Sequence, residues 1–385
     1  MTSPTNVWLP LEGVQHDVAI EVLLRGPVSR KQLAHRLGVT AGTVTRAAQP
    51  LLSAGLLVEK AAQQLPGLGR PEAPLDLELQ RDFFVGIKIT AEGIHGVATT
   101  LRAQIVAEHT APLPSLAADD VADQVAMVVD TLARQVPSVR AVGISLGGQV
   151  VDETFVTQAL LLGWNAVDFG ALMRSRLEAP VVIDNDVLSL VRAERWFGAA
   201  RDIDHFALLT IGAGLGYGLV AAGQLVEIPD SGLSPITHFP LDIGGGVCQQ
   251  GHIGCAETLL TTHALRERAR PVLGDDVGYN ELLRLAPTNA AASAIVETAA
   301  FALGKLIAGI ANLALPRKII LTGDGVELAF AGREALERGI AAHRNTRASP
   351  VDLQIQSVGF SEWARGAAAT AIETFVVGRQ GHRRH

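Results

Sequence analysis

The sequence contains little cysteine and no long uninterrupted apolar run. Two cysteines occur in 385 residues, which is too few for a disulfide framework. The longest apolar stretch, residues 301–323, is broken by charged residues and a proline, so it cannot span a bilayer. The opening MTSPTNVWLPLEG has neither a basic flank nor an apolar core, so we expect no secretory or transit signal there. These absences predict a cytoplasmic protein without a membrane partner.

Basic residues are concentrated in one part of an otherwise acidic chain. The net charge is −7 and 48% of the residues are hydrophobic, as in folded globular proteins, and the length predicts two or three domains. Between positions 25 and 70, one acid, Glu59, accompanies seven bases: Arg25, Arg30, Lys31, Arg36, Arg46, Lys60 and Arg70. A local surplus of positive charge is typical of a nucleic-acid-binding module, because it attracts the phosphate backbone.

Helix signals follow one another through this basic region. The apolar spacing over residues 13–25 predicts a helix that stops at a Gly-Pro pair. Ser29 and Gln32 form a capping box that opens a second helix, RKQLAHRL, and Gly38 ends it. Thr40 caps a third helix, AGTVTRAAQPLLSAG. The tight turn between the second and third helices predicts a helix-turn-helix.

Residues after the turn complete a winged-helix pattern. Gly55 closes the third helix, and Pro50 within it is expected to kink or shorten it. Residues 56–60, LLVEK, predict the first strand of a wing. The following PGLGRPEAP, residues 66–74, is expected to be a semi-rigid linker after the wing, with Arg70 entering the minor groove. A plain hinge is the alternative for this segment.

The third helix offers side chains suited to reading DNA. We expect Val44 and Leu51 to face the core, whereas short hydroxyls and one arginine near the helix start point outward and fit the major groove. The predicted DNA-binding residues are Arg30, Lys31, Thr43, Thr45, Arg46, Gln49 and Arg70. The alternative is a helix-turn-helix that contacts only proteins.

From residue 81 onward, strand-like and helix-like segments alternate. The β-rich runs are FFVGIKI, IHGVATTL, AVGISLGG, PVVIDND, FALLTIGAGLGYGLVAAG and KIILTGDG. Helical patterns lie between them at residues 118–134, 187–197, 291–314 and 361–375. This alternation predicts an α/β fold, and the glycine turns at strand ends are typical sites for phosphates and sugars.

Four of these segments, in this order, carry a resemblance. They are GWNAVDFGALMRSRLEAPVVIDNDVLSLVRAERWFGAAR, TIGAGLGYGLVAAGQLV, CQQGHIGCAETL and IILTGDG, all downstream of a winged helix ending in GRP. Together they resemble the ROK family of repressors and sugar kinases over almost the whole chain. The resemblance implies a winged helix-turn-helix over residues 1–80 and, over residues 81–385, a two-lobed actin-like (ribonuclease H-like) ATPase fold. It also implies sugar and ATP sites in the cleft between the lobes, and a homodimer or homotetramer.

Both phosphate loops depart from the pattern of the family's kinases. Kinase members carry Asp-x-Gly-Gly-Thr after the first strand, where this chain has Lys88 and then Thr90, Ala91 and Glu92. Glu92 would repel the phosphates, and the two side chains fill space that glycines leave open. In the second loop, GAGLG, Ala213 replaces a threonine. We therefore expect no ATP binding and no enzyme activity, although Asp186 in DND matches the kinase base.

The sugar positions implied by the resemblance are only partly kept. Asn185, Asp186, His238 and Glu257 match residues that contact the sugar. Leu160 and Pro235 replace polar ones, which leaves sugar hydroxyls unpaired. We expect a weakly bound hexose or a smaller, modified or less hydroxylated effector. The alternative is that the four matching residues are structural remnants.

The two cysteines match an incomplete metal site of the family. Family members hold structural zinc with one His and three Cys, and this chain supplies His238, Cys248 and Cys255 while Gln250 replaces the middle Cys. Glutamine is a poor zinc ligand, so water or His252 would complete the set. The spacing between the cysteines is not the CxxC of redox motifs. A zinc site of reduced affinity is therefore expected.

These observations favour a transcriptional regulator, in the role of a repressor, that binds a double-stranded palindromic operator and senses a sugar-like effector. One alternative is an active ATP-dependent sugar kinase with an appended DNA-binding domain. Another is a regulator without any small-molecule ligand, controlled by partners or abundance.

Overall fold

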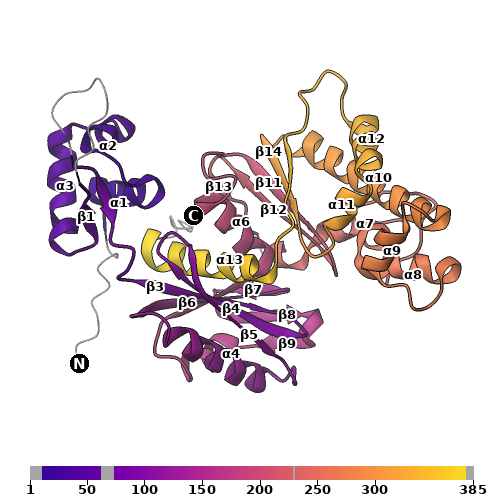
Figure 1. Cartoon of the computed structure of the whole chain (residues 1–385), viewed down its shortest axis with the longest axis horizontal. Helices are drawn as coiled ribbons and strands as arrows, with labels where there is room; N and C mark the ends of the chain where they lie inside the picture. The colour runs from indigo at the N-terminus through magenta and orange to yellow at the C-terminus, as the bar shows by residue number, and fades with distance from the viewer. Residues whose placement is uncertain (1–10, 62–72, 229, 379–385) are drawn as a thin grey trace.

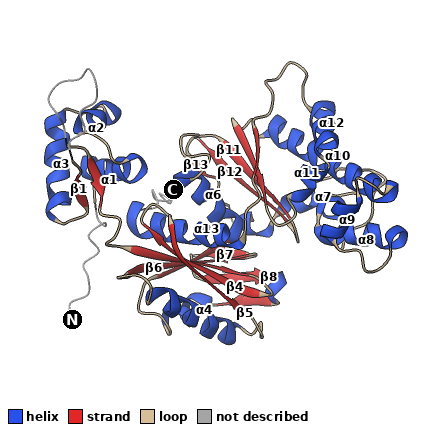
Figure 2. Cartoon of the chain, in the orientation of Figure 1, coloured by secondary structure: helices blue, strands red, loops and turns tan. Residues whose placement is uncertain are grey.

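The computed structural model describes residues 11–61, 73–228 and 230–378. Figure 1 shows a small N-terminal head beside a larger body built around two separate sheets. Helices and strands alternate through the body, and helices pack against both sheets (Figure 2). The α/β class predicted for the chain after residue 81 is confirmed.

Three helices and a two-stranded ribbon form the head. They are α1 (Gly13–Arg25), α2 (Arg30–Leu37), α3 (Ala41–Ser53), β1 (Leu57–Glu59) and β2 (Leu75–Leu77). The Ser29–Gln32 capping box is present, Gly38 ends α2 in the left-handed conformation at φ 65°, and Thr40 caps α3. Helix α3 continues through Pro50 to Ser53, so the expected shortening is wrong.

The second wing strand corrects the prediction for the Gly-Pro-rich segment. Strand β2 pairs antiparallel with β1, with Leu57 opposite Leu77. Residues 66–74 therefore connect the two wing strands and are not a linker after the wing. Strand β2 is only three residues long, too short to give a clear alternating pattern in the sequence. Arg70 lies outside the described residues.

The first sheet of the body forms the N-terminal lobe. Its strand order is β10 (Val181–Asn185), β6 (Val139–Leu146), β3 (Phe83–Ile89), β4 (Gly93–Thr100) and β5 (Ile105–Pro112). Helix α4 (Ala118–Ala133) packs on one face and the C-terminal helix α13 (Phe360–Ile372) on the other. Every residue of β3 is buried because both faces of the sheet are covered.

A small second sheet follows in the same lobe. It is made of β7 (Gln149–Val151), β8 (Phe155–Ala159) and β9 (Trp164–Val167). The 3-10 turn η1 (Leu160–Leu162) precedes β9, and α5 (Phe169–Arg174) follows it.

The C-terminal lobe has its own five-stranded sheet. Its strand order is β13 (Gln224–Leu225), β12 (Leu215–Ala221), β11 (Phe206–Ile211), β14 (Lys318–Thr322) and β15 (Leu353–Ile355). Two 3-10 turns and six helices complete the lobe: η2 (Ser231–Leu233), η3 (Pro235–His238), α7 (Ala256–Leu260), α8 (Thr262–Leu273), α9 (Tyr279–Leu285), α10 (Ala290–Leu313), α11 (Glu327–Ala331) and α12 (Arg333–His343). One apolar core joins this sheet to α10, and a second joins it to α6.

Helix α10 is long and apolar enough to cross a membrane by composition, but two thirds of its most apolar window (67%) is buried inside the fold. Lys305 in this helix donates a hydrogen bond to the carbonyl of Leu241. The chain then turns at residues 314–317 and enters β14. The apolar stretch at 301–323 is therefore part of a helix, a turn and a strand, as its internal charges indicated.

Two helices fill the space between the sheets. Helix α6 (Asp186–Phe197) packs against α13 and also contacts β12, while α13 lies on β3 and β6. The contact of α13 with the sheet is backbone to backbone: a Cβ atom on Gly143 would come 1.9 Å from the carbonyl oxygen of Ala367. The π-helical turn η4 (Glu373–Val377) extends α13 toward the head.

We predict that Gly143→Ala destabilises the protein, because the added methyl group must displace the backbone of α13. Overpacking of this kind costs about 1–3 kcal/mol. Gly42→Ala is the matched control, since its new Cβ meets nothing closer than 3.8 Å and lies on an exposed helix. Chemical denaturation should show a loss of stability only for Gly143→Ala. Equal stabilities of the two variants would contradict the packing described above.

Candidate DNA-binding surface and interlobe site

Helix α3 presents its predicted core residues inward and its predicted reading residues outward. Val44 and Leu51 are buried, and Thr45, Arg46 and Gln49 are exposed. The Thr45 hydroxyl donates to the carbonyl of Ala41 within the same helix. Thr43 is half-buried and its hydroxyl lies 2.9 Å from that of the capping Thr40. Among the residues that the structure describes, Arg46 and Gln49 have no side-chain partner and are therefore free to meet a ligand.

Arg30 has a structural partner that sequence reasoning missed. One guanidinium nitrogen forms an ion pair with Glu59 at 2.5 Å and the other donates to the carbonyl of Ala73 at 3.3 Å. Arg30 thus ties the start of α2 to both ends of the wing. Lys31, the next residue, is exposed on α2.

Polar contacts dock the head on the body. Arg102, in the turn after β4, donates to Asp76 of the wing at 2.6 Å and to the carbonyl of Val22 at 2.8 Å. Arg25 pairs with Asp202 of the body at 2.6 Å, and this hydrogen bond lowers the pKa of the Asp202 carboxyl. Apolar residues of the head also join one core with β3, β10 and α13.

The interlobe site consists of Lys88, Asn185, Asp186, the loop 212–216 and Asp324. Asn185 ends β10 and caps α6: its oxygen accepts hydrogen bonds from two backbone amides of the helix, and its amide donates to the carbonyl of Gly148. One amide hydrogen is all that remains of this side chain for a ligand. The loop 212–216 adjoins the same helix end, because a Cβ atom on Gly216 would lie 2.3 Å from the Val187 side chain.

Lys88 forms an ion pair with Asp186 in this site. The ammonium group donates to one carboxylate oxygen, and the other accepts from the backbone amide of Val187. The two side chains are only 8% and 13% exposed, and the ammonium also lies over the ring of Trp363 at 5.2 Å. Burial, together with the charge of Lys88, lowers the pKa of neighbouring His95. The Asp186 carboxylate is therefore held by Lys88 where a kinase would need a free base.

The loop positions add further negative charge. Glu92 is exposed on the hairpin after β3. The Asp324 carboxylate, which sequence reasoning missed, lies against the second loop: a Cβ atom on Gly212 would come 1.7 Å from its oxygen. Both carboxylates would repel a triphosphate, and a side chain at position 212 would collide with Asp324. The signal in the sequence was the acidic residue inside the last glycine turn, TGDG.

The remaining sugar-matching positions differ in their surroundings. Leu160 is 77% exposed and Pro235 is exposed, so neither is used to fill the core. His238 and Glu257 lie side by side, with Nδ1 of the imidazole 3.5 Å from a carboxylate oxygen. Asp186 is not part of this pair. The structure thus separates the four matching residues into a helix-cap pair, Asn185 and Asp186, and a second pair near the cysteines.

The predicted metal ligands come together. Sγ of Cys248 and Sγ of Cys255 lie 3.7 and 3.9 Å from Nδ1 of His238, and Glu257 joins the cluster, with all ligand atoms within 4.8 Å of one another. A tetrahedral zinc ion with ordinary bond lengths separates its nitrogen and sulfur ligands by about 3.6–3.8 Å. These residues therefore fit the ion. Gln250 is exposed and outside the cluster, and Nδ1 of His252 lies 3.6 Å from Sγ of Cys248.

Arg192 is a further residue that the sequence did not single out. It is fully buried in α6 and binds three carboxylates from three segments: Asp184, Glu227 and Glu373. Burial alone would lower the pKa of the guanidinium, but the three carboxylates outweigh it and raise the pKa. An arginine in a helix is common in any sequence, so only the fold reveals these partners.

The geometry defines a winged-helix head joined to a two-lobed body with actin-like sheets. The family model described as ROK family matches residues 84–374, and the chain belongs to that family. The DNA-binding transcriptional dual regulator NagC of Escherichia coli K12 is 25% identical over 323 residues, which cover 78% of each chain.

Solved structures show the same fold. A ROK family transcriptional regulator described as a homologue of the E. coli MLC protein superposes with a TM-score of 0.78 at 22% identity, covering 94% of this chain and 96% of that one. A ROK family glucokinase from Streptomyces griseus in complex with glucose and AMPPNP has a TM-score of 0.65 at 21% identity, covering 75% of this chain and 99% of the glucokinase.

We predict that Lys88→Met destabilises the protein by roughly 3 kcal/mol, because it leaves the Asp186 carboxylate buried without its partner. The double variant Lys88→Met/Asp186→Asn should regain most of this loss, since neither charge remains. Urea denaturation of the wild type, the single variants Lys88→Met and Asp186→Asn, and the double variant gives the coupling free energy of the pair. Additive effects of the two substitutions would show that the pair is not a buried ion pair.

Proposed function

We propose that this chain is a DNA-binding transcriptional regulator, acting as a repressor, whose body senses a ligand and does not phosphorylate it. The observation that carries the proposal is the free Arg46 side chain on the outer face of α3, within a winged helix docked on the body. The ion pair of Asp186 with Lys88 supports the absence of phosphorylation, because phosphoryl transfer needs a base that accepts the sugar proton. The regulatory role of the E. coli relative supports the first half.

In this proposal residues 1–80 bind DNA and residues 81–385 receive the effector. Arg46 and Gln49 read base edges, Thr43 and Thr45 offer methyl groups, and Lys31 contacts phosphate. Arg30 supports the wing, and Arg70 belongs to the segment between the wing strands. Two heads of a dimer read a palindrome, as two-fold symmetry requires.

The effector is a sugar-like molecule with fewer free hydroxyls than a hexose. Asp186, His238 and Glu257 offer polar groups, and Asn185 offers one amide hydrogen. Leu160 and Pro235 are exposed where polar groups would pair with hydroxyls, so they favour a ligand that presents a methyl, acyl or deoxy position there. ATP is not part of the working state, because Glu92 and Asp324 oppose its phosphates.

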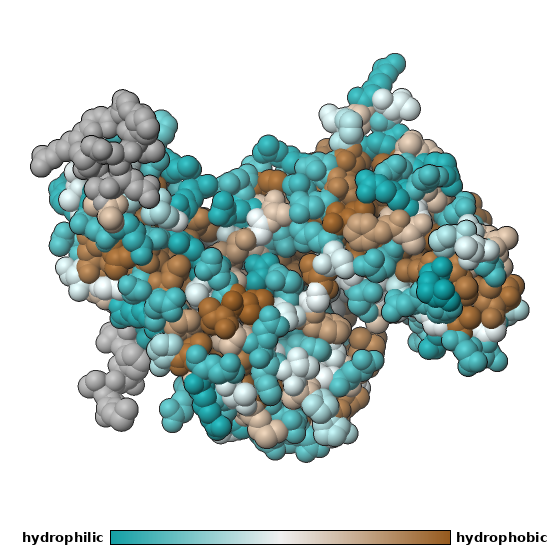
Figure 3. All heavy atoms as spheres, viewed as in Figure 1, coloured by the Kyte–Doolittle hydropathy of each residue, from teal (hydrophilic) through white to brown (hydrophobic). Residues whose placement is uncertain are grey.

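The working form is a cytoplasmic homodimer or homotetramer. Apolar residues gather in patches on the C-terminal lobe (Figure 3), and large apolar side chains there are exposed: Phe301, Leu313, Leu315 and Phe330. Exposed apolar surface of this kind supports self-association. A dimer also supplies the second head that a palindromic operator needs.

Zinc is the metal that the cluster suits best. His238, Cys248 and Cys255 supply three ligands, and His252 or Glu257 supplies the fourth. When bound, zinc would hold the loop of residues 248–255 to η3 and α7, so its role is structural. The ion would also fix the position of His238 and hence one side of the proposed effector site.

We predict that Arg46→Ala lowers discrimination between specific and random duplexes by about 1–3 kcal/mol, because a base contact is lost. Lys31→Ala should weaken binding to all duplexes alike and reduce the salt dependence, because a phosphate contact is lost. The bound sequence is first selected from random duplexes with the full chain, and affinities are then measured by fluorescence anisotropy at several salt concentrations.

Two results would overturn the proposal. One is the failure of the full chain to select any duplex. The other is sugar phosphorylation with ATP and Mg²⁺ that disappears in Asp186→Asn, which would show that the chain is a sugar kinase with an appended DNA-binding domain.

We predict that purified protein contains zinc and that Cys248→Ser or Cys255→Ser loses it, since each removes one of the two thiolate ligands. Elemental analysis by mass spectrometry measures the zinc content per chain. Gln249→Ser is the matched control, because this exposed residue lies in the same loop and outside the cluster. Full zinc content in the two cysteine variants would rule out the site.

A further inference from the structure

Helix α6 runs from the interlobe site to the docking surface of the head. Its first residue is Asp186, the partner of Lys88, and its last turn carries Arg195 and Trp196. A helix of twelve residues spans about 18 Å. One rigid element therefore has one end in the proposed effector site and the other end beside the head.

Arg192 anchors the middle of this helix to three separate segments. Its guanidinium donates to Asp184 at 2.5 Å, to Glu373 at 2.6 Å and to Glu227. Asp184 lies on β10 directly before Asn185, Glu227 follows β13 in the C-terminal lobe, and Glu373 follows α13. A movement of either lobe relative to the other must therefore change at least one of these bonds or move α6.

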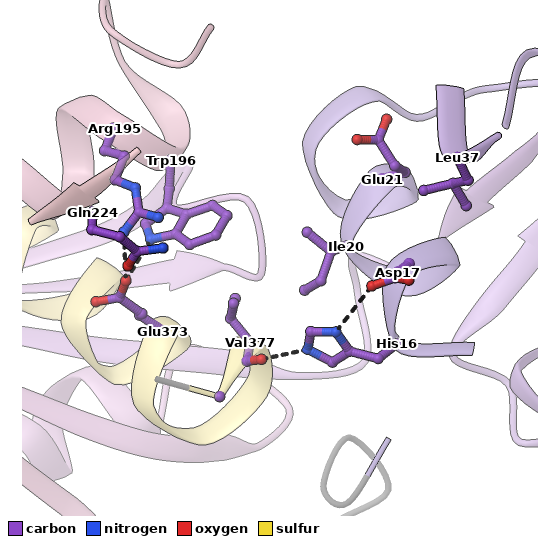
Figure 4. A pocket seen from close by; sticks show the side chains of 11 residues that line it. His16, Asp17, Ile20, Glu21, Leu37, Arg195, Trp196, Gln224, Glu373 and Val377 are labelled. Atoms are coloured by element: carbon purple, nitrogen blue, oxygen red, sulfur yellow. Dashed lines mark hydrogen bonds and ion pairs between the residues drawn. The ribbon is translucent and has the colours of Figure 1, made fainter. Parts of the chain in front are cut away.

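Glu373 continues the connection to the head. Its second oxygen accepts hydrogen bonds from the indole of Trp196 at 2.9 Å and from Arg195 at 3.3 Å. Glu373 also begins the π-helical turn that ends at Val377, whose carbonyl accepts a hydrogen bond of 2.6 Å from His16 of α1. Figure 4 shows these bonds on the two sides of one pocket.

That pocket lies between the head and the body at the end of α13. It has a volume of about 170 Å³ and lies between Arg195, Trp196, Glu373 and Val377 on the body and α1, with Leu37, on the head. A close-packed contact would resist a shift, whereas unfilled space beside α1 allows one. The His16 bond is the polar contact at this edge of the head, in addition to Arg102, Arg25 and the shared apolar core.

We propose that α6, with Arg192 and Glu373 as positioning residues, couples the interlobe site to the orientation of the head. A ligand bound at the interlobe site then changes the affinity of the head for DNA. By thermodynamic linkage, DNA bound to the head changes the affinity of the interlobe site for its ligand by the same factor. The inference rests on the proposed function and names its regulation. Because of reciprocity, DNA itself can serve as the probe, and the effector need not be known.

The test measures hydrogen–deuterium exchange of residues 184–190 in the full chain, with and without the duplex selected from the random pool. In the wild type, the duplex should change the exchange of these residues at least twofold, although they lie far from α3. In Glu373→Gln, the duplex should still bind within about threefold of wild type, but the change at residues 184–190 should disappear. Trp196→Phe, which removes the indole N–H together with one ring of the indole and keeps an aromatic side chain, should give the same loss.

Glu337→Gln is the control, because it breaks an exposed ion pair on α12 away from α6 and should keep the response. A merely structural role of Glu373 would raise exchange without DNA and leave the duplex-dependent change in place. That result, or the absence of any change in the wild type despite tight binding, would overturn the inference. Failure to select any duplex would instead overturn the proposed function, and the inference with it.

Discussion

A buried ammonium group paired with a buried carboxylate decides what the body of this protein can do. Lys88 and Asp186 come from different elements of one lobe, and the cost of desolvating either charge is met only while both are present. Asp186 cannot act as a free base that accepts a proton while its carboxylate is held in a buried ion pair with Lys88. The fold of a phosphoryl-transfer enzyme is therefore kept, while the group that would start the transfer is held in a fixed bond.

Polar side chains along α6 are likewise bonded to other groups of the protein. The side chain of Asn185 can form four hydrogen bonds, and three of them are made to the helix amides and to Gly148. The guanidinium of Arg192 binds three carboxylates. Each bond reduces the chemistry available to a ligand and increases the rigidity of the helix. A sensor benefits from this exchange, because a rigid helix transmits displacement whereas a catalytic site needs free groups.

Periodic, buried elements were predictable from the sequence, and elements defined by distant partners were not. The all-apolar run of β3 and the caps of α2 and α3 are local signals, and each lies where it was predicted. The short strands β2 and β7 to β9 carry too few residues for a pattern, and β5 alternates between half-buried and exposed residues on an edge. The Lys88 substitution was visible in the sequence, but its partner was not, because 98 residues separate them. Arg192 was missed because a helical arginine gives no sign of its three partners, whereas Asp324 had a signal in the TGDG turn that was not used.

The metal cluster and the ion pair lie on different lobes, and this separation constrains how a ligand can act. His238 and Glu257 belong to segments of the C-terminal lobe, whereas Asp186 follows a strand of the N-terminal lobe. A ligand that contacts both sets must bridge the lobes and thereby fix their relative position. Arg192 already joins the two lobes through Asp184 and Glu227, so the same relative position determines the strain on its bonds. A small molecule can therefore exert force on α6 without touching Arg192, provided that it reaches both lobes at once.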